Sequence, residues 1–175
     1  MKDRRAKGSH RRKRAAIALA RAHRTVRNQR TNFHHQLSHR LVNAYGLLAM
    51  EDLSILNLTA TPEPKPDPDP DHEGQYLPNG AAAKAGLNQS ILDAGWGQFQ
   101  SFCIAKAASA GRRVVLFDPH MTSQHCSGCG AVVPKPLEER MHTCPHCGLV
   151  LDRDHNAAIN ILSRGQEVAH AATAA

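Results

Sequence analysis

The sequence predicts an α/β fold with a small cysteine-rich module, and three observations lead to this class. Residues 10–45 contain neither glycine nor proline, and their apolar side chains recur at helical intervals. Two short apolar runs, residues 47–53 and 113–118, are typical of buried strands. Two Cys-x-x-Cys units, separated by fourteen residues, follow the second run and are typical of a module folded around a metal ion.

The composition is that of a globular protein without a membrane span. Hydrophobic residues make up 41% of the 175 positions and aromatic residues 4%, so any core must be mostly aliphatic. The apolar runs fall short of the ~20 residues that a transmembrane helix needs. A secretory signal would require an apolar segment directly after the basic amino terminus, and this sequence has none there. We therefore expect a cytoplasmic protein, whose five cysteines are unsuited to disulfides in that reducing compartment.

The positive charge is concentrated near the amino terminus. Residues 1–40 hold 13 Lys and Arg against one acid, Asp3, whereas the remaining residues hold 9 against 14. Such a segment suits a polyanion, and nucleic acid fits best because each neutralised phosphate releases counterions. The alternative is a solvated helix whose charges serve solubility. On the nucleic-acid interpretation the protein is nucleoid-associated, and the contacting residues are Arg11, Arg12, Lys13, Arg14, Arg21, Arg24, Arg27 and Arg30.

The basic segment is expected to be one long helix over residues 10–45, which Ser9 can cap and Gly46 can end. The run that follows, LLAMEDL at residues 47–53, fits a buried strand that ends at Glu51 and Asp52, although its periodicity also fits a helical turn. The apolar stripe of the long helix consists of Leu19, Ala22, Val26, Phe33, Leu37 and Leu41.

The middle of the chain alternates between loop and helix. Residues 61–80, in which proline alternates with charged residues, predict an extended loop, most simply a surface insertion. Residues 81–110 are alanine-rich and expected to be mostly helical, with one helix over residues 90–110 on which Cys103 is buried. Residues 113–118 predict a second strand. Three aromatic residues share one face of that helix and form either core or a base-stacking platform: Trp96, Phe99 and Phe102.

The cysteines match the ligand set of a zinc ribbon over residues 120–150: Cys126, Cys129, Cys144 and Cys147. A glycine follows each unit and permits a positive φ, and the fourteen intervening residues suit a β-hairpin. Four thiolates fill the coordination shell, so the zinc would be structural. A redox dithiol or an iron–sulfur cluster is the alternative. The surrounding histidines are not expected to be ligands: His120, His125, His142 and His146.

Two groups of acids stand where metal chemistry would need them. Glu51 ends the first strand, and Asp152 and Asp154 begin the last helix, so the two groups could meet across a cleft. Phosphodiester cleavage by two Mg²⁺ ions requires such carboxylates. The alternatives are that Asp154 is an N-cap and that Glu51 and Asp52 form a strand-end pair facing water.

Several motifs together resemble the TnpB family, the RNA-guided nucleases of insertion sequences that are also described as accessory transposases. Miniature type V CRISPR nucleases are similar. The resemblance covers nearly the whole chain and rests on KGSHRRKR (7–14), NQRTNFHHQLSHRLV (28–42), AMEDL (49–53), LNQSILDAGWGQF (87–99), GRRVVLFDPHMTSQHCSGCG (111–130), TCPHCG (143–148) and LDRDHNAAINIL (151–162).

The resemblance implies a partial RNase H-like (RuvC) domain that lacks its first strands, over residues 1–119. The zinc ribbon (120–150) is inserted before the last helix of that domain (151–164), and a disordered tail (165–175) follows. It also implies a DNA-binding protein of DNA transposition and recombination. Such a protein is a Mg²⁺-dependent endonuclease whose partners are DNA and a guide RNA.

The resemblance assigns Glu51 as the middle glutamate and Asp154 as the final aspartate of the family's catalytic triad, with Asp152 the less favoured of its pair. The family's first aspartate lies on a strand upstream of the basic helix, whereas Asp3 lies in KDRR, which is no strand. Asp118 ends an apolar strand that only leads into the ribbon.

With two of three metal ligands, the chain is expected to be inactive alone, and whether it is an enzyme stays open. A missing N-terminal fragment could complete the domain in trans. Alternatively, the chain could be the product of a truncated or decayed reading frame. If that product were unfolded, only the zinc ribbon would be ordered. The alternative from another class is a non-catalytic, nucleic-acid-binding zinc-ribbon protein that regulates the element.

Overall fold

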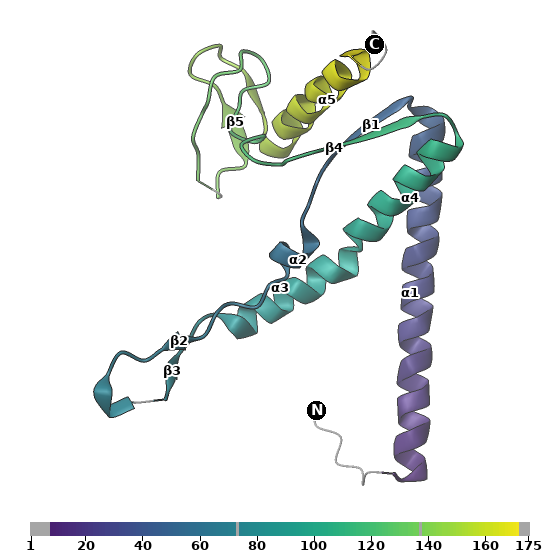
Figure 1. Cartoon of the computed structure of the whole chain (residues 1–175), viewed down its shortest axis with the longest axis vertical. Coiled ribbons are helices and arrows are strands. Elements are labelled where there is room, and N and C mark those ends of the chain that lie inside the picture. Colours follow the sequence, from purple (N-terminus) through teal and green to yellow (C-terminus); the bar gives the residue numbers. More distant parts are fainter. Residues whose placement is uncertain (1–7, 73, 137, 172–175) are drawn as a thin grey trace.

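The computed structural model describes residues 8–72, 74–136 and 138–171, and Asp3 lies outside them. The long helix α1 spans His10–Ala44, in agreement with the prediction. The Ser9 side chain accepts a hydrogen bond from the backbone N–H of Arg12 at 3.2 Å, as an N-cap does. In Figure 1 the first half of α1 projects away from the rest of the molecule.

The strands β1 (Leu47–Glu51) and β4 (Arg113–Phe117) form a parallel pair, from Leu47 opposite Arg113 to Glu51 opposite Phe117. The strand interpretation of LLAMEDL is therefore confirmed, although β1 ends at Glu51. The backbone N–H of Asp52 still donates to the carbonyl of Phe117 at 2.7 Å, and the chain then turns into the short helix α2 (Ile55–Leu58).

The predicted loop at residues 61–80 is an arm that contains local structure. Strands β2 (Lys65–Pro66) and β3 (Tyr76–Leu77) pair antiparallel, and the 3-10 helix η1 (Pro70–His72) lies between them. Figure 1 shows this arm extending beyond the start of α3, far from the parallel strands.

The single helix predicted over residues 90–110 is wrong, because the structure has two helices, α3 (Ala81–Ala94) and α4 (Trp96–Ser109). They meet at Gly95, whose φ of 64° is left-handed. A Cβ at Gly95 would lie 2.8 Å from Cε1 of His34 on α1, so only glycine permits this approach. As predicted, Cys103 of α4 is fully buried.

The apolar stripe expected on α1 does not form a core along its whole length. Leu19 and Val26 are exposed, and so are all side chains from residue 16 to residue 29. The buried face of α1 consists of His34, Ser38 and Val42, near the end that packs against α4. Helical periodicity identified the helix but could not show which part of it has a packing partner.

The helix α5 (Arg153–Ala171) packs against β1, and α1 and α4 also contact the strand pair (Figure 1). At Gly165 a Cβ would lie 2.9 Å from that of Ala49, so the helix lies close on the strand. The prediction of a helix ending at residue 164 is wrong for residues 165–171. The contact at Gly165 and the alanine-rich sequence both favour continued helix. Residues 172–175 of the predicted tail lie outside the described residues.

The ribbon contains the antiparallel strands β5 (Met141–Thr143) and β6 (Val150–Asp152). They flank the second cysteine unit, and an isolated bridge between His125 and Val132 flanks the first. The expectation of a hairpin within the fourteen intervening residues is therefore wrong, because each cysteine unit forms the turn of its own strand pairing. Among the helices that the structure describes, none has the length and apolarity to cross a membrane.

Candidate functional site

The four cysteines of the ribbon lie together. Their Sγ atoms are all within 4.8 Å of one another, and the pairs Cys126–Cys147 and Cys129–Cys144 are each 3.6 Å apart. Four sulfurs at ~2.3 Å from a tetrahedral zinc ion would be separated by roughly 3.8 Å. The cluster therefore fits a four-coordinate metal such as zinc, and in the described part of the chain no histidine joins this group.

The backbone around the two cysteine units has the same geometry twice. Gly130 and Gly148 both have a φ of 75°, and their N–H groups donate to the carbonyls of Cys126 and Cys144 at 2.8 and 3.0 Å. A positive φ suits glycine, which explains why this residue follows each unit. The first turn is also held by the residue after its glycine, since the N–H of Cys126 donates to the carbonyl of Ala131 at 2.9 Å.

The thiols ionise unequally in the absence of a metal ion. Burial opposes ionisation of Cys144, but hydrogen bonds from the backbone N–H groups of Cys147 and His146 lower its pKa to about 6. The N–H of Leu149 favours the thiolate of Cys147, but hydrogen bonds with the neighbouring thiols raise its pKa to about 12. Because the neighbouring thiols raise the pKa of Cys147, a bound cation would be needed to hold all four cysteines as thiolates.

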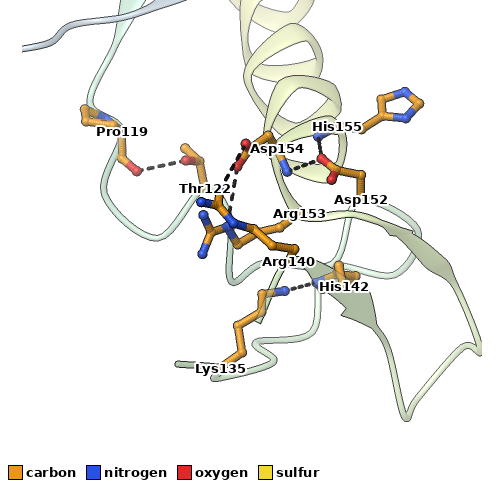
Figure 2. A network of polar contacts seen from close by, with 9 residues as sticks. All are labelled: Pro119, Thr122, Lys135, Arg140, His142, Asp152, Arg153, Asp154 and His155. Atoms are coloured by element: carbon orange, nitrogen blue, oxygen red, sulfur yellow. Dashed lines mark hydrogen bonds and ion pairs between the residues drawn. The ribbon is translucent and has the colours of Figure 1, made fainter. Parts of the chain in front are cut away.

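At the start of α5, Asp152 and Asp154 have different roles. The Asp152 carboxylate accepts hydrogen bonds from the backbone N–H groups of Asp154 and His155 at 2.8 and 3.1 Å (Figure 2). The N–H groups of His155 and Asp154 hold the pKa of Asp152 below its ordinary range. The suggestion that Asp154 is the N-cap is therefore wrong: Asp152 caps the helix, and the carboxylate of Asp154 is not used for this purpose.

Glu51 and Asp154 line the same cavity, which has a volume of about 790 Å³. Its wall is otherwise mostly apolar and includes Met50, Ile55, Trp96 and Phe99. Burial and the negative charge of Asp154 both raise the pKa of Glu51 above its ordinary value of 4.5. The two acids that the sequence singled out are thus brought together, as two carboxylates that share one site and repel each other.

Other acids do not share this arrangement. Asp118 accepts a hydrogen bond from the N–H of His120 at 2.9 Å and is not part of the cavity lining. Asp52 is not part of that lining either. Trp96, expected in the core, is 44% exposed and lines the cavity. The core interpretation is therefore wrong for Trp96, which is the first residue of α4 and borders the open cavity.

Sequence reasoning missed three polar residues at this site. The Gln100 side-chain amide donates to the carbonyl of Glu51 at 3.2 Å and so ties α4 to the end of β1. Arg140 and Arg153 approach the carboxylate of Asp154, at 3.9 and 3.4 Å (Figure 2). Arg140 has no sequence signature at this site, because it approaches Asp154 only through the pairing of β5 with β6, whereas Arg153 directly precedes Asp154 in the sequence.

The eight cations expected to bind nucleic acid all lie on α1. Arg30 forms an ion pair with Asp93 of α3 at 2.6 Å. In the part of the chain that the structure describes, no ion pair joins the other seven to an acid. Most of them are exposed: Arg11, Lys13, Arg14, Arg21, Arg24 and Arg27. They present positive charge along one projecting helix.

Two family models match different parts of the chain. The model described as "Probable transposase" matches residues 2–61, which include α1 and β1. The model described as "Cas12f1-like, TNB domain" matches residues 96–161, which include α4, β4 and the cysteine cluster.

Curated relatives match nearly the whole chain. A protein of Streptomyces pristinaespiralis named as an RNA-guided DNA endonuclease is 39% identical over 165 residues, which are 93% of this chain and 35% of the relative. The similarly named InsQ of Escherichia coli is 27% identical over 151 residues, 86% of this chain and 36% of the relative. The chain thus spans about a third of the length of these relatives.

A solved complex of Cas12f1 with sgRNA and target DNA aligns with 83% of this chain and 36% of its own, at a TM-score of 0.49 and 17% identity. These sequence matches confirm the resemblance drawn from the motifs, since the chain is similar over 93% of its length to a protein named as an RNA-guided DNA endonuclease and over 90% of its length to a mimivirus protein named as TnpB-like.

Proposed function

We propose that this chain is the carboxyl-terminal, RuvC-type nuclease part of an RNA-guided, Mg²⁺-dependent DNA endonuclease of an insertion sequence. One observation carries this proposal: Glu51 at the end of β1 and Asp154 in the first turn of α5 line a single cavity. The relationship to proteins named as RNA-guided DNA endonucleases supports it. On this proposal β1, β4, α4 and α5 are elements of an RNase H-like domain.

Glu51 and Asp154 are the residues that would hold Mg²⁺. Carboxylate oxygens are the ligands that Mg²⁺ prefers, and a shared cation would offset the repulsion by which Asp154 raises the pKa of Glu51. The bound ion would polarise the scissile phosphate and lower the pKa of a water molecule. Gln100 binds the backbone carbonyl of Glu51 rather than its carboxylate, and Asp152 rather than Asp154 caps the helix, so neither of these contacts occupies the two carboxylates.

We propose that this 175-residue chain does not cleave DNA by itself. Among the described residues that line the cavity, Glu51 and Asp154 are the acids. In the described part of the chain β1 pairs with β4 along one edge, and its other edge has no strand. A strand added there, parallel to β1, would bring its own carboxyl end beside Glu51 and could supply a third carboxylate, either in trans or from the same reading frame.

The cysteine cluster would hold a structural zinc ion, because four thiolates leave no position for substrate. Helix α1 would bind the phosphate backbone of guide RNA or target DNA through its exposed cations, so that the protein acts on the nucleoid. The exposure of these cations also favours a second candidate function, a protein that binds nucleic acid without cutting it.

Metal titration of the purified, zinc-loaded chain tests the proposed site. Mn²⁺ binding, followed by electron paramagnetic resonance, should be lost in Glu51→Gln and Asp154→Asn. Glu63→Gln, which changes an exposed acid of the arm, should bind Mn²⁺ as the unaltered chain does. Equal affinity in all four proteins would reject the carboxylate site and leave the binding-only function.

A cleavage assay in the same buffer tests whether the chain is complete. End-labelled single- and double-stranded DNA should stay intact with the chain and Mg²⁺, while gel shifts show salt-sensitive binding. Cleavage that disappears in Glu51→Gln would support the nuclease site but overturn the proposal that a third carboxylate must be added.

A further inference from the structure

Two asparagines of α5 reach from the helix to the first cysteine unit. The Asn156 side chain is fully buried; its Nδ2 donates to the carbonyl of His125 at 2.7 Å, and its Oδ1 accepts from the N–H of Ser127 at 2.9 Å. The Asn160 amide donates to the carbonyls of Thr122 and His125 at 2.9 and 2.8 Å. The two side chains therefore hold the segment 122–127 from one face of the helix.

These contacts connect the cysteine cluster to the acid of the cavity. Ser127 directly follows Cys126, so the N–H group that donates to Oδ1 of Asn156 belongs to the metal-binding turn itself. Asn156 is also two positions after Asp154, on the same first turns of α5. If the turn around Cys126 lost its shape, the buried amide of Asn156 would lose its protein partners, which is costly.

The other attachments of the first turn of α5 also come from the ribbon. The backbone N–H of Arg153 donates to the carbonyl of Arg140, which directly precedes β5, at 2.7 Å. The capping residue Asp152 belongs to β6. By contrast, the second half of the helix is attached to the sheet, where Gly165 lies against Ala49. The position of Asp154 thus depends on the ribbon, and the position of the helix as a whole depends on the sheet.

We propose that metal binding at the cysteine cluster is coupled to the placement of Asp154 through Asn156 and Asn160, which act as positioning residues. Coupling of this kind is reciprocal, so loss of the asparagine contacts must weaken metal binding as well. The significance of Asp154 rests on the proposed nuclease function, but the coupling between the cluster and the first turns of α5 does not.

Zinc affinity is the first measurement. Competition with a chromophoric chelator should show zinc binding weakened about 10-fold or more in Asn156→Asp, which keeps the size of the side chain and loses the donor to His125. Asn160→Ala, which removes two donors from a partly buried side chain, should weaken it in the same direction. Ser163→Ala, on the exposed face of the same helix, is the matched control and should leave affinity unchanged.

Hydrogen exchange of the full chain is the second measurement. Removing zinc from the unaltered protein should accelerate exchange in residues 153–160 at least 10-fold, with little change in residues 100–107 of α4. In Asn156→Asp with zinc bound, residues 153–160 should already exchange faster. Wild-type zinc affinity in both asparagine variants, or zinc-independent exchange in residues 153–160, would overturn the coupling. Neither result depends on Mg²⁺ binding or cleavage, so failure of the nuclease proposal would be seen separately.

Discussion

Glu51 at the end of β1 and Asp154 in the first turn of α5 face one cavity, and the charge of Asp154 raises the pKa of Glu51. The sheet places the first acid, since β1 ends where its last hydrogen bond to β4 is made. The ribbon places the second, since it supplies the cap of α5 and the partners of Asn156. The strand pair and the ribbon therefore meet at these two carboxylates, and the contribution of each can be tested.

The first prediction concerns pH and Glu51. Because the folded state raises this pKa above 4.5, protonated Glu51 favours folding below pH 4.5, and that contribution is lost as pH rises through the higher folded value. Glu51→Gln should therefore unfold at higher urea concentration than the unaltered chain at pH 7 without Mg²⁺. The gain should stay below about 1 kcal/mol because the side chain is partly solvated.

The gain should shrink toward pH 4.5, whereas Glu63→Gln should show no such pH dependence. All three proteins carry the same cysteine cluster, so its own response to pH cancels in the comparison. Equal stability of the two variants at pH 7 would contradict the pKa argument.

Some of this arrangement could be predicted because it depends on local sequence. The absence of glycine and proline from residues 10–45, together with Ser9, defines α1. The cysteine spacing defines the metal-binding cluster, since each unit closes its own turn. The two acids could be proposed as a pair because each ends or begins a recognisable element.

The rest depends on contacts that no local pattern reveals. The sequence around Gly95 is compatible with one continuous helix. Only the close approach of His34, which the sequence does not reveal, explains why the chain needs glycine there. Leu19 and Val26 look like core residues, but nothing in their spacing says that the first half of α1 projects from the molecule. Asp152 and Asp154 are both plausible caps, and only the backbone of β6 decides between them.

The second prediction concerns metal content. The purified chain should hold one zinc ion, and Cys147→Ser should lose it under mild chelation because one of four thiolates is missing. Cys103→Ala should keep the zinc, since Cys103 is buried in α4 and is not part of the cluster. Zinc can be measured by atomic absorption after gel filtration. Retention in Cys147→Ser, or loss in Cys103→Ala, would contradict the ligand assignment.

The third prediction compares two glycines with opposite outcomes. Gly165→Ala would place a Cβ 2.9 Å from that of Ala49 and should destabilise the protein by about 1–3 kcal/mol. Gly86→Ala, in α3, meets nothing within 4 Å and should stabilise by about 0.5–1 kcal/mol because glycine disfavours helix. Urea unfolding with zinc present measures both. A neutral Gly165→Ala would show that α5 can shift away from β1 without cost.

The fourth prediction concerns the cations of α1. Arg21 and Arg24 are exposed and have no ion pair among the described residues, so replacing both with Gln should remove about two phosphate contacts. The slope of the logarithm of the nucleic-acid binding constant against that of salt should then fall by about 2. Arg30 pairs with Asp93, so Arg30→Gln should change this slope less and instead remove the ion pair that joins α1 to α3. Fluorescence anisotropy with labelled RNA and DNA between about 50 and 200 mM salt gives the slopes. Lys65→Gln on the arm, compared with Arg21→Gln alone, is the control for net charge. An equal effect of these two single variants would mean that binding follows total charge rather than helix α1.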